Sequence, residues 1–235
     1  MKTKLGKQEM QLLAYIQMRK RRTVKTGELL DPLQLSRDQE RELFRRMARG
    51  GLIARVRPGL YLVPEQLPLG GSWSPDEFLA LNTLMEDRNG RYQICGPNAF
   101  NRYGFDEQIP SRVYAYNNRI SGERTIGVIE LTLIKVTNNR LGDTDQGQTA
   151  VYASRVRTLI DAVYDWSRFN SLPRAYDWIR QELKEKRVSM EELVTAALRY
   201  GDKGTIRRMG ALKEKYLSMM IPSGLLRHRL RREKT

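Results

Sequence analysis

The chain has 235 residues, 40% of them hydrophobic, and a formal net charge of +15. This hydrophobic content is enough for a packed core and excludes an intrinsically disordered chain. One cysteine (Cys95) and one histidine (His228) exclude an internal disulfide and a Cys/His zinc cluster, and the histidine lies in a basic tail that suits no catalytic triad. The sequence also has no GxxxxGK[ST] or GxGxxG phosphate loop. We expect no enzyme activity, cofactor or metal, although carboxylate chemistry stays open because Asp and Glu are plentiful.

No segment is typical of a membrane or secreted protein. No run approaches the roughly 18 apolar residues that span a bilayer, and Met1–Leu5 lacks the apolar run of a signal peptide. We therefore expect a cytoplasmic protein with no membrane partner. Cys95 follows a strand-like run, which favours a buried, inert thiol.

Positive charge is concentrated at the two ends of the chain. Residues 1–60 contain 15 Lys and Arg against 6 Asp and Glu, and residues 199–235 contain 11 against 3. The residues between them contain 16 against 18. Clustered basic charge predicts a polyanionic partner such as nucleic acid, and a protein that is merely basic and soluble is the alternative.

The first two predicted elements are helices. Residues 7–22 have the apolar spacing of an amphipathic helix and end in a basic cluster. Thr26 can cap a short second helix through Leu30, which Asp31 and Pro32 stop because the residue before proline resists helical geometry. The apolar stripe of the first helix consists of Leu12, Leu13 and Ile16, with Met10 as a further candidate.

The third predicted helix has the clearest boundaries. Ser36 and Gln39 have the spacing of a capping box, and Gly50-Gly51 ends the helix. Its buried side is expected to consist of Leu43, Phe44 and Met47.

A β-hairpin is predicted after the third helix. Two strand-like runs, 52–56 and 60–63, flank Arg57-Pro58-Gly59. Three helices followed by a hairpin is the order of a winged helix-turn-helix, which we assign to residues 1–66. A Pro- and Gly-containing stretch, 64–75, is the expected linker to a second domain at residues 72–235.

The second domain is predicted to mix helices and strands and to end in a helical block, so the fold class is α+β. Strands are expected at 92–95, 113–116 and 126–136, and a loop at 138–148. Helices are expected at 78–85, 98–103, 155–166, 173–186, 189–200 and 203–219. Arg157 and Asp161, four residues apart on one helix, favour a structural ion pair over an active site.

The third helix carries the candidate DNA-binding side chains. A helix fits the major groove, residues near its start reach the bases, and the arginine fork pairs with guanine. Arg37, Gln39 and Arg41 are therefore the expected base readers, while Asp38 could orient an arginine or accept from cytosine. The wider candidate set adds Ser36, the more distant Arg45, Arg46 and Arg49, which suit phosphates, and Arg55 and Arg57 of the hairpin.

Further phosphate contacts are expected from two other basic segments. The final residues, 225–235, contain five basic residues and one acid, and a frayed, solvated end is the alternative interpretation. The additional candidates are Arg21, Arg22, Lys25, Arg227, Arg229, Arg231 and Arg232.

Two alternatives explain the third helix without DNA. Its acids, Asp38, Glu40 and Glu42, could pair with its arginines at helical spacing and leave a solvated charged face. A winged helix can also bind proteins, since fold alone does not determine function.

Several short motifs occur in a characteristic order along the chain, at 48–64, 94–100, 103–104, 108–110, 157–161 and 207–210. Through the order of these motifs the chain resembles the AbiEi-type antitoxins of type IV toxin–antitoxin systems and their transcriptional-regulator relatives. The resemblance implies a winged helix that represses its own promoter and a C-terminal domain that counters a nucleotidyltransferase-like toxin. We expect the promoter site to consist of inverted repeats, because dimeric regulators of this kind bind two-fold symmetric sites.

Three classes of function follow from these observations. The first is a nucleoid-associated, sequence-specific repressor of double-stranded DNA that serves as an antitoxin. The second is a stand-alone winged-helix regulator, or a protein-interaction module, without a cognate toxin. The third is a nucleic-acid enzyme such as a carboxylate–metal nuclease, which would need two or three acids in one pocket.

Overall fold

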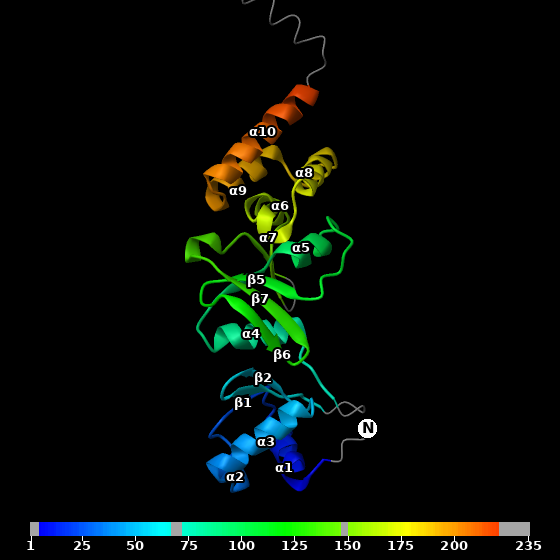
Figure 1. The fold of residues 1–235 in the computed structure, drawn as a ribbon. Helices are drawn as coiled ribbons and strands as arrows, with labels where there is room; N and C mark the ends of the chain where they lie inside the picture. The colour runs from blue at the N-terminus through cyan, green and yellow to red at the C-terminus, as the bar shows by residue number, and fades with distance from the viewer. Residues whose placement is uncertain (1–4, 67–71, 147–149, 221–235) are drawn as a thin grey trace, which may run out of the picture. The chain divides into compact units, whose positions relative to one another are not determined.

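The computed structural model describes residues 5–66, 72–146 and 150–220 (Figure 1). Contacts between Cα atoms divide the chain into two compact units. The first consists of Met1–Tyr92 and Ser111–Thr137, and the second of Gln93–Pro110 and Asn138–Thr235. The α+β class expected from the sequence is confirmed, because helices and a mixed sheet are both present.

The first unit begins with three helices and a three-stranded antiparallel sheet. The strand β3 is central, with β1 and β2 on either side of it. The elements are α1 (Lys7–Met18), β1 (Thr23–Lys25), α2 (Leu30–Leu33), α3 (Arg37–Arg49), β2 (Ala54–Arg57) and β3 (Leu60–Leu62).

These elements share one hydrophobic core. The predicted stripe of α1 is confirmed, since Leu12, Leu13 and Ile16 are buried, whereas Met10 is 53% exposed. Phe44 of α3 stacks on Tyr61 of β3 with ring centroids 4.6 Å apart. The core also contains Val24, Leu29, Leu43, Met47, Leu52, Ile53 and Val63.

The first helix is shorter than the predicted range 7–22. It ends at Met18 because Lys20 adopts a left-handed conformation, with φ of 51°. The amide of Arg21 then donates to the carbonyl of Ile16, and the amide of Lys20 to that of Gln17. This is the Schellman pattern, which satisfies the last helical carbonyls before the chain turns away.

The prediction of a second helix at 26–30 is wrong, because the helix α2 occupies Leu30–Leu33. Residues 23–25 form a strand because Val24 gains a partner, Tyr61, and becomes buried. The helix α2 follows at Leu30–Leu33 and contains Pro32. Proline is tolerated there because the first helical residues need no amide hydrogen for the backbone ladder.

The rest of the first unit consists of α4 (Glu77–Glu86), β5 (Val113–Asn117), β6 (Gly122–Ile126) and β7 (Ile129–Lys135). Strands β5 and β7 pair in parallel, and β6 pairs with β7 in antiparallel fashion. The single strand predicted at 126–136 is therefore half of a hairpin, which turns at Gly127, where φ is 65°. Asp76 caps α4 by accepting from the amide of Leu79 at 2.7 Å.

The second unit is largely helical. The loop predicted at 138–148 instead contains a 3-10 helix, η1 (Asn138–Arg140), and β8 (Thr144–Gln146), because the polar segment pairs with β9 (Val151–Ala153). Strand β4 (Tyr92–Ile94) pairs in parallel with β9, and β8 pairs with β9 in antiparallel fashion. The helices are α5 (Gly96–Arg102), α6 (Arg155–Tyr164), α7 (Trp166–Phe169), α8 (Arg174–Lys184), α9 (Met190–Tyr200) and α10 (Lys203–Met220).

Two further expectations for the second unit are confirmed. Cys95 is fully buried. The Nε of Arg157 lies 2.9 Å from a carboxylate oxygen of Asp161, and both side chains are fully buried.

The helices in the described part of the chain do not combine the length and the apolar run needed to cross a bilayer.

Candidate nucleic-acid interface

Helix α3 is held at its start by the predicted capping box. The hydroxyl of Ser36 accepts from the amide of Gln39 at 3.2 Å, and the side-chain oxygen of Gln39 accepts from the amide of Ser36 at 2.8 Å. Two otherwise unpaired backbone donors are thereby satisfied. The cap leaves the side-chain amide NH₂ of Gln39 as its remaining donor group.

A buried carboxylate fixes α3 to the turn before α2. Glu40 is fully buried and accepts from the backbone amides of Gly27 at 2.7 Å and Leu29 at 3.0 Å. Sequence reasoning treated Glu40 as a surface partner for arginine, which is wrong. The spacing of Glu40 to Leu43, Phe44 and Met47 placed it on the apolar side of the helix, and this signal could have identified it.

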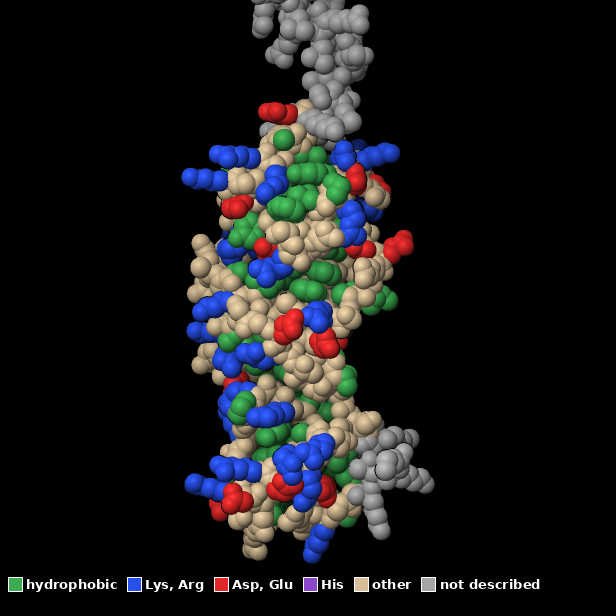
Figure 2. All heavy atoms as spheres, viewed as in Figure 1, with side chains coloured by type: hydrophobic (Ala, Val, Ile, Leu, Met, Phe, Trp, Pro, Cys, Tyr) green, Lys and Arg blue, Asp and Glu red, His purple; other side chains and the backbone are tan. Residues whose placement is uncertain are grey.

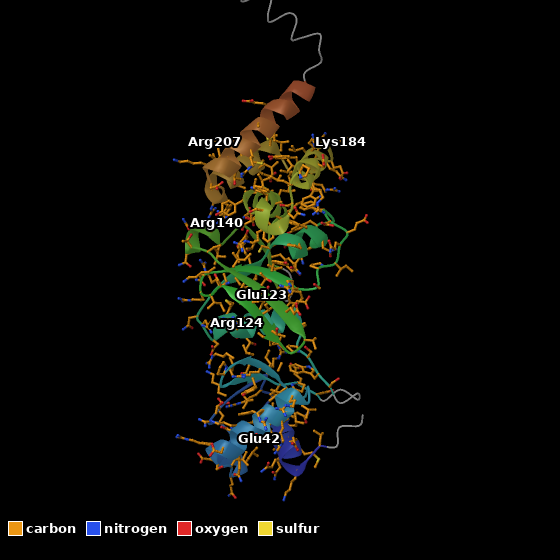
Figure 3. All side chains as sticks on the ribbon, in the orientation of Figure 1. Glu42, Glu123, Arg124, Arg140, Lys184 and Arg207 are labelled. Atoms are coloured by element: carbon orange, nitrogen blue, oxygen red, sulfur yellow. The ribbon has the colours of Figure 1, made fainter. Side chains whose placement is uncertain are left out.

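On the exposed face of α3, some arginines have no acid in close contact, whereas Arg45 is bound by a neighbouring carboxylate. Arg41 is 71% exposed, and its guanidinium lies 3.7 Å from the carboxylate of Asp38, a long distance for an ion pair, with the side chain of Asp38 94% exposed. Arg45 binds Glu42 through two hydrogen bonds of 2.8 Å, which lower the pKa of Glu42 (Figure 3). Among the described residues, Arg37 and Arg49 are exposed and have no ion pair.

Arg46 contacts the first helix instead of solvent alone. Its guanidinium lies 3.2 Å from Glu9 of α1, whose side chain is 15% exposed. The pair therefore helps to join α1 to α3, and Arg46 has less freedom to meet a phosphate than Arg49 does.

The two hairpin arginines differ in their surroundings. Arg55 is exposed. Arg57 instead forms two hydrogen bonds of 2.6 Å with the carboxylate of Asp87, just after α4, and donates to the carbonyl of Pro58. Its guanidinium is therefore occupied within the first unit. Sequence reasoning missed Asp87, since nothing local connects a residue after one helix to a turn 30 residues earlier.

The additional basic candidates are scattered. Arg21 pairs with Glu28 at 2.9 Å and Arg22 with Glu65, while Lys25 is exposed. The candidates in the tail, Arg227, Arg229, Arg231 and Arg232, lie outside the described residues.

The second unit contains a buried charged cluster of its own. Besides Arg157, Asp161 has Arg140 at 3.7 Å, and Arg140 stacks 3.6 Å above the ring of Tyr164. The carboxylate thus faces two guanidinium groups, which suits a structural network. Across the described residues, no three His, Cys, Asp or Glu side chains come together as metal ligands.

Comparisons with known proteins give a likeness of fold. The chain is similar to the RV2827C protein from Mycobacterium tuberculosis, whose crystal structure matches it with a TM-score of 0.57. The match covers 89% of this chain and 77% of that one, at 14% sequence identity. No protein-family model and no curated protein matches the chain. At this identity the likeness concerns the fold alone.

Proposed function

We propose that the protein is a sequence-specific, double-stranded DNA-binding transcriptional repressor. In this proposal residues 1–66 are a winged helix-turn-helix, α3 is the recognition helix, and the β2–β3 hairpin is the wing. The observation that carries it is the construction of α3, which is capped by Ser36, anchored by buried Glu40, and lined with exposed arginines on its other side.

The exposed side chains near the start of α3 have the chemistry for reading bases. Arg37 and Arg41 are exposed. The ion pair between Arg41 and Asp38 is exposed and 3.7 Å long, so it is too weak to compete with a bidentate contact between Arg41 and guanine. Asp38 can accept from cytosine, and the free NH₂ of Gln39 can donate to a base edge. Arg45 and Arg49, further along, suit phosphates.

The resemblance to AbiEi-type antitoxins extends the proposal. The repressor would act on its own promoter, at inverted repeats, and the second unit would counter a nucleotidyltransferase-like toxin. The order of the short motifs along the chain supports this extension. If the protein is instead a stand-alone regulator without a toxin, the proposed role of α3 in DNA binding is unchanged.

A protein-interaction module is the second candidate, and one observation favours it. The exposed face of α3 carries acids as well as arginines, and Glu42 already neutralises Arg45. Such a mixed face also suits a protein partner of complementary charge.

Anisotropy titration of the full chain with a labelled duplex from its own promoter tests the proposal. We expect tighter binding to the promoter than to a scrambled duplex of equal length. The affinity should also fall as salt rises, because each phosphate contact adds roughly 0.9 to the salt slope, which is the steepness of the fall of log affinity with log salt concentration. Equal affinity for both duplexes would contradict sequence-specific recognition. No binding to either would favour the protein-interaction module.

A further inference from the structure

Basic side chains outside residues 1–66 lie beside the hairpin within the first unit. They come from the turn after α4 and from the loop between β5 and β6. The ion pair between Arg57 and Asp87, with two contacts of 2.6 Å, joins the hairpin to the first of these segments.

Two more cations lie close to the same carboxylate. Arg57 lowers the pKa of Asp87 most strongly, through its hydrogen bonds, and the charges of Lys25 and Arg88 lower it further. Lys25 and Arg57 both lie opposite Leu60, on either side of the central strand β3. Arg57 thus binds Asp87 directly, and the charges of Lys25 and Arg88 act on the same carboxylate, which leaves a local excess of positive charge.

The β5–β6 loop adds a fourth cation next to Arg88. The guanidinium of Arg119 donates to the carbonyl of Asn89, with its Nε at 3.0 Å. The two loops are also joined through backbone groups, since the amide of Arg91 donates to the side chain of Asn118 at 2.8 Å and the amide of Asn118 to the carbonyl of Arg91 at 3.3 Å. These bonds hold the cationic segments in place before any ligand arrives.

Asp87, which Arg57 already binds, offsets only part of the positive charge of this group. Within the described residues, Lys25, Arg88, Arg91 and Arg119 have no acid at ion-pair distance, and a carbonyl leaves the charge of Arg119 intact. The Nε of Arg88 is buried without an acceptor among those residues. Figure 2 shows Lys and Arg side chains along the left edge of the view, including at the height of α4 and β2.

We propose that Lys25, Arg88, Arg91 and Arg119, here called the basic shelf, bind phosphates of the same duplex that α3 reads. The shelf extends the DNA contact beyond residues 1–66 and adds affinity without base preference, because phosphates carry no sequence information directly. The guanidinium of Arg119 is fixed by its hydrogen bonds to the carbonyl of Asn89, and an arginine side chain can bind phosphate oxygens in a bidentate manner. This inference rests on the proposed function.

Charge removal in the full chain tests the shelf. The shelf variant is Arg88→Gln with Arg119→Gln. The matched control is Lys184→Gln with Lys186→Gln, which removes two exposed cations in and just after α8, of which Figure 3 labels Lys184. Binding to the promoter and scrambled duplexes is measured over a range of salt concentrations, and circular dichroism melting checks that each variant is folded. Arg91→Gln serves as a third variant, because Arg91 is exposed and its backbone contacts survive the change.

The outcomes separate the shelf from the proposed function. We expect the shelf variant to bind both duplexes on the order of tenfold more weakly and to lose about 2 from the salt slope, with its preference for the promoter retained. Arg91→Gln should lose about half as much slope, and the control should match the wild type. Wild-type affinity and slope in both shelf variants would overturn the shelf while leaving the repressor intact. A wild-type chain that binds neither duplex would overturn both.

Discussion

Single residues of the first unit divide into arginines that serve the fold and arginines that face solvent. Arg57 and Arg46 hold acids of neighbouring elements, at Asp87 and Glu9. Arg41 has only a distant, exposed acid. Residue type alone therefore does not indicate which arginine is free for a ligand, because a guanidinium binds a carboxylate as readily as a phosphate.

Arg41→Ala tests base reading. We expect the change to cost about 1–3 kcal/mol on the promoter duplex and to relax preference at one base pair, because a bidentate contact with a base edge is lost. Arg45→Ala, four residues along the same helix, is the control, and it should weaken all duplexes alike. Titrations over a set of single-base changes decide the matter. If Arg45→Ala alone altered the preference, α3 would be docked differently from our proposal.

The pair between Arg57 and Asp87 should make stability depend on pH. Arg57 holds the pKa of Asp87 below its ordinary value, so the stabilisation is complete above the unfolded-state pKa of about 4 and is lost as the pH falls through the lower folded-state pKa. Asp87→Asn should therefore cost about 1 kcal/mol at pH 7, a modest value because water reaches Arg57, and less near pH 3. Urea denaturation measures both. A difference that does not shrink at low pH would contradict this assignment.

At the scale of elements, buried attachments determine how each helix is held. Helix α3 is fixed by the two amides that Glu40 binds. Helix α5 begins at Gly96, where φ is 57° and an added Cβ would lie 2.6 Å from the ring of Phe169. Both attachments join segments that are separate in the sequence.

Glu40→Ala should destabilise the protein by about 2–3 kcal/mol, because the amide of Leu29 is left buried without an acceptor and that of Gly27 loses its carboxylate. Glu42→Ala is the matched control. Its side chain is 44% exposed and, among the described residues, forms an ion pair with Arg45 at 2.8 Å, so the change should leave the free energy of unfolding close to that of the wild type. If chemical denaturation gave equal losses in the free energy of unfolding for both variants, the buried hydrogen bonds of Glu40 would not be the source of the stabilisation.

Gly96→Ala should cost about 2–5 kcal/mol, since the methyl group meets buried Phe169 and the left-handed backbone disfavours alanine. Gly104→Ala separates the two causes, because Gly104 has φ of 72° but no atom within 4 Å of the added methyl. Only the backbone penalty, about 1 kcal/mol, applies there. Thermal melting of both variants compares them, and similar losses would exclude the steric contribution.

In the whole molecule, the linker predicted at 64–75 does not coincide with the boundary between the two compact units. The first compact unit continues through Tyr92 and includes β5, β6 and β7. Strand β2 contacts both α4 and β6 within it. The domain boundary between 66 and 72 stays a prediction, and these contacts indicate what a fragment cut there would lose.

Two fragments test the division. We expect residues 1–66 to fold and bind the promoter weakly, since they keep α3 but lose Asp87 and most of the basic shelf. Residues 72–235 should fold and lack sequence preference. Circular dichroism and anisotropy titration measure both properties. Full promoter affinity in the second fragment would mean that α3 is not the reader.

Features that depend on near neighbours could be predicted from the sequence. The bounds of α3, its capping box and the apolar stripe of α1 follow from spacings of three and four residues, which local helix geometry translates directly into contacts. The strand β1, the burial of Glu40 and the pair between Arg57 and Asp87 depend instead on contacts between distant segments, whose partners no local pattern indicates. A three-residue strand has no stability until a partner binds its backbone, and a charged side chain takes its role from whichever group of opposite charge the fold brings near it.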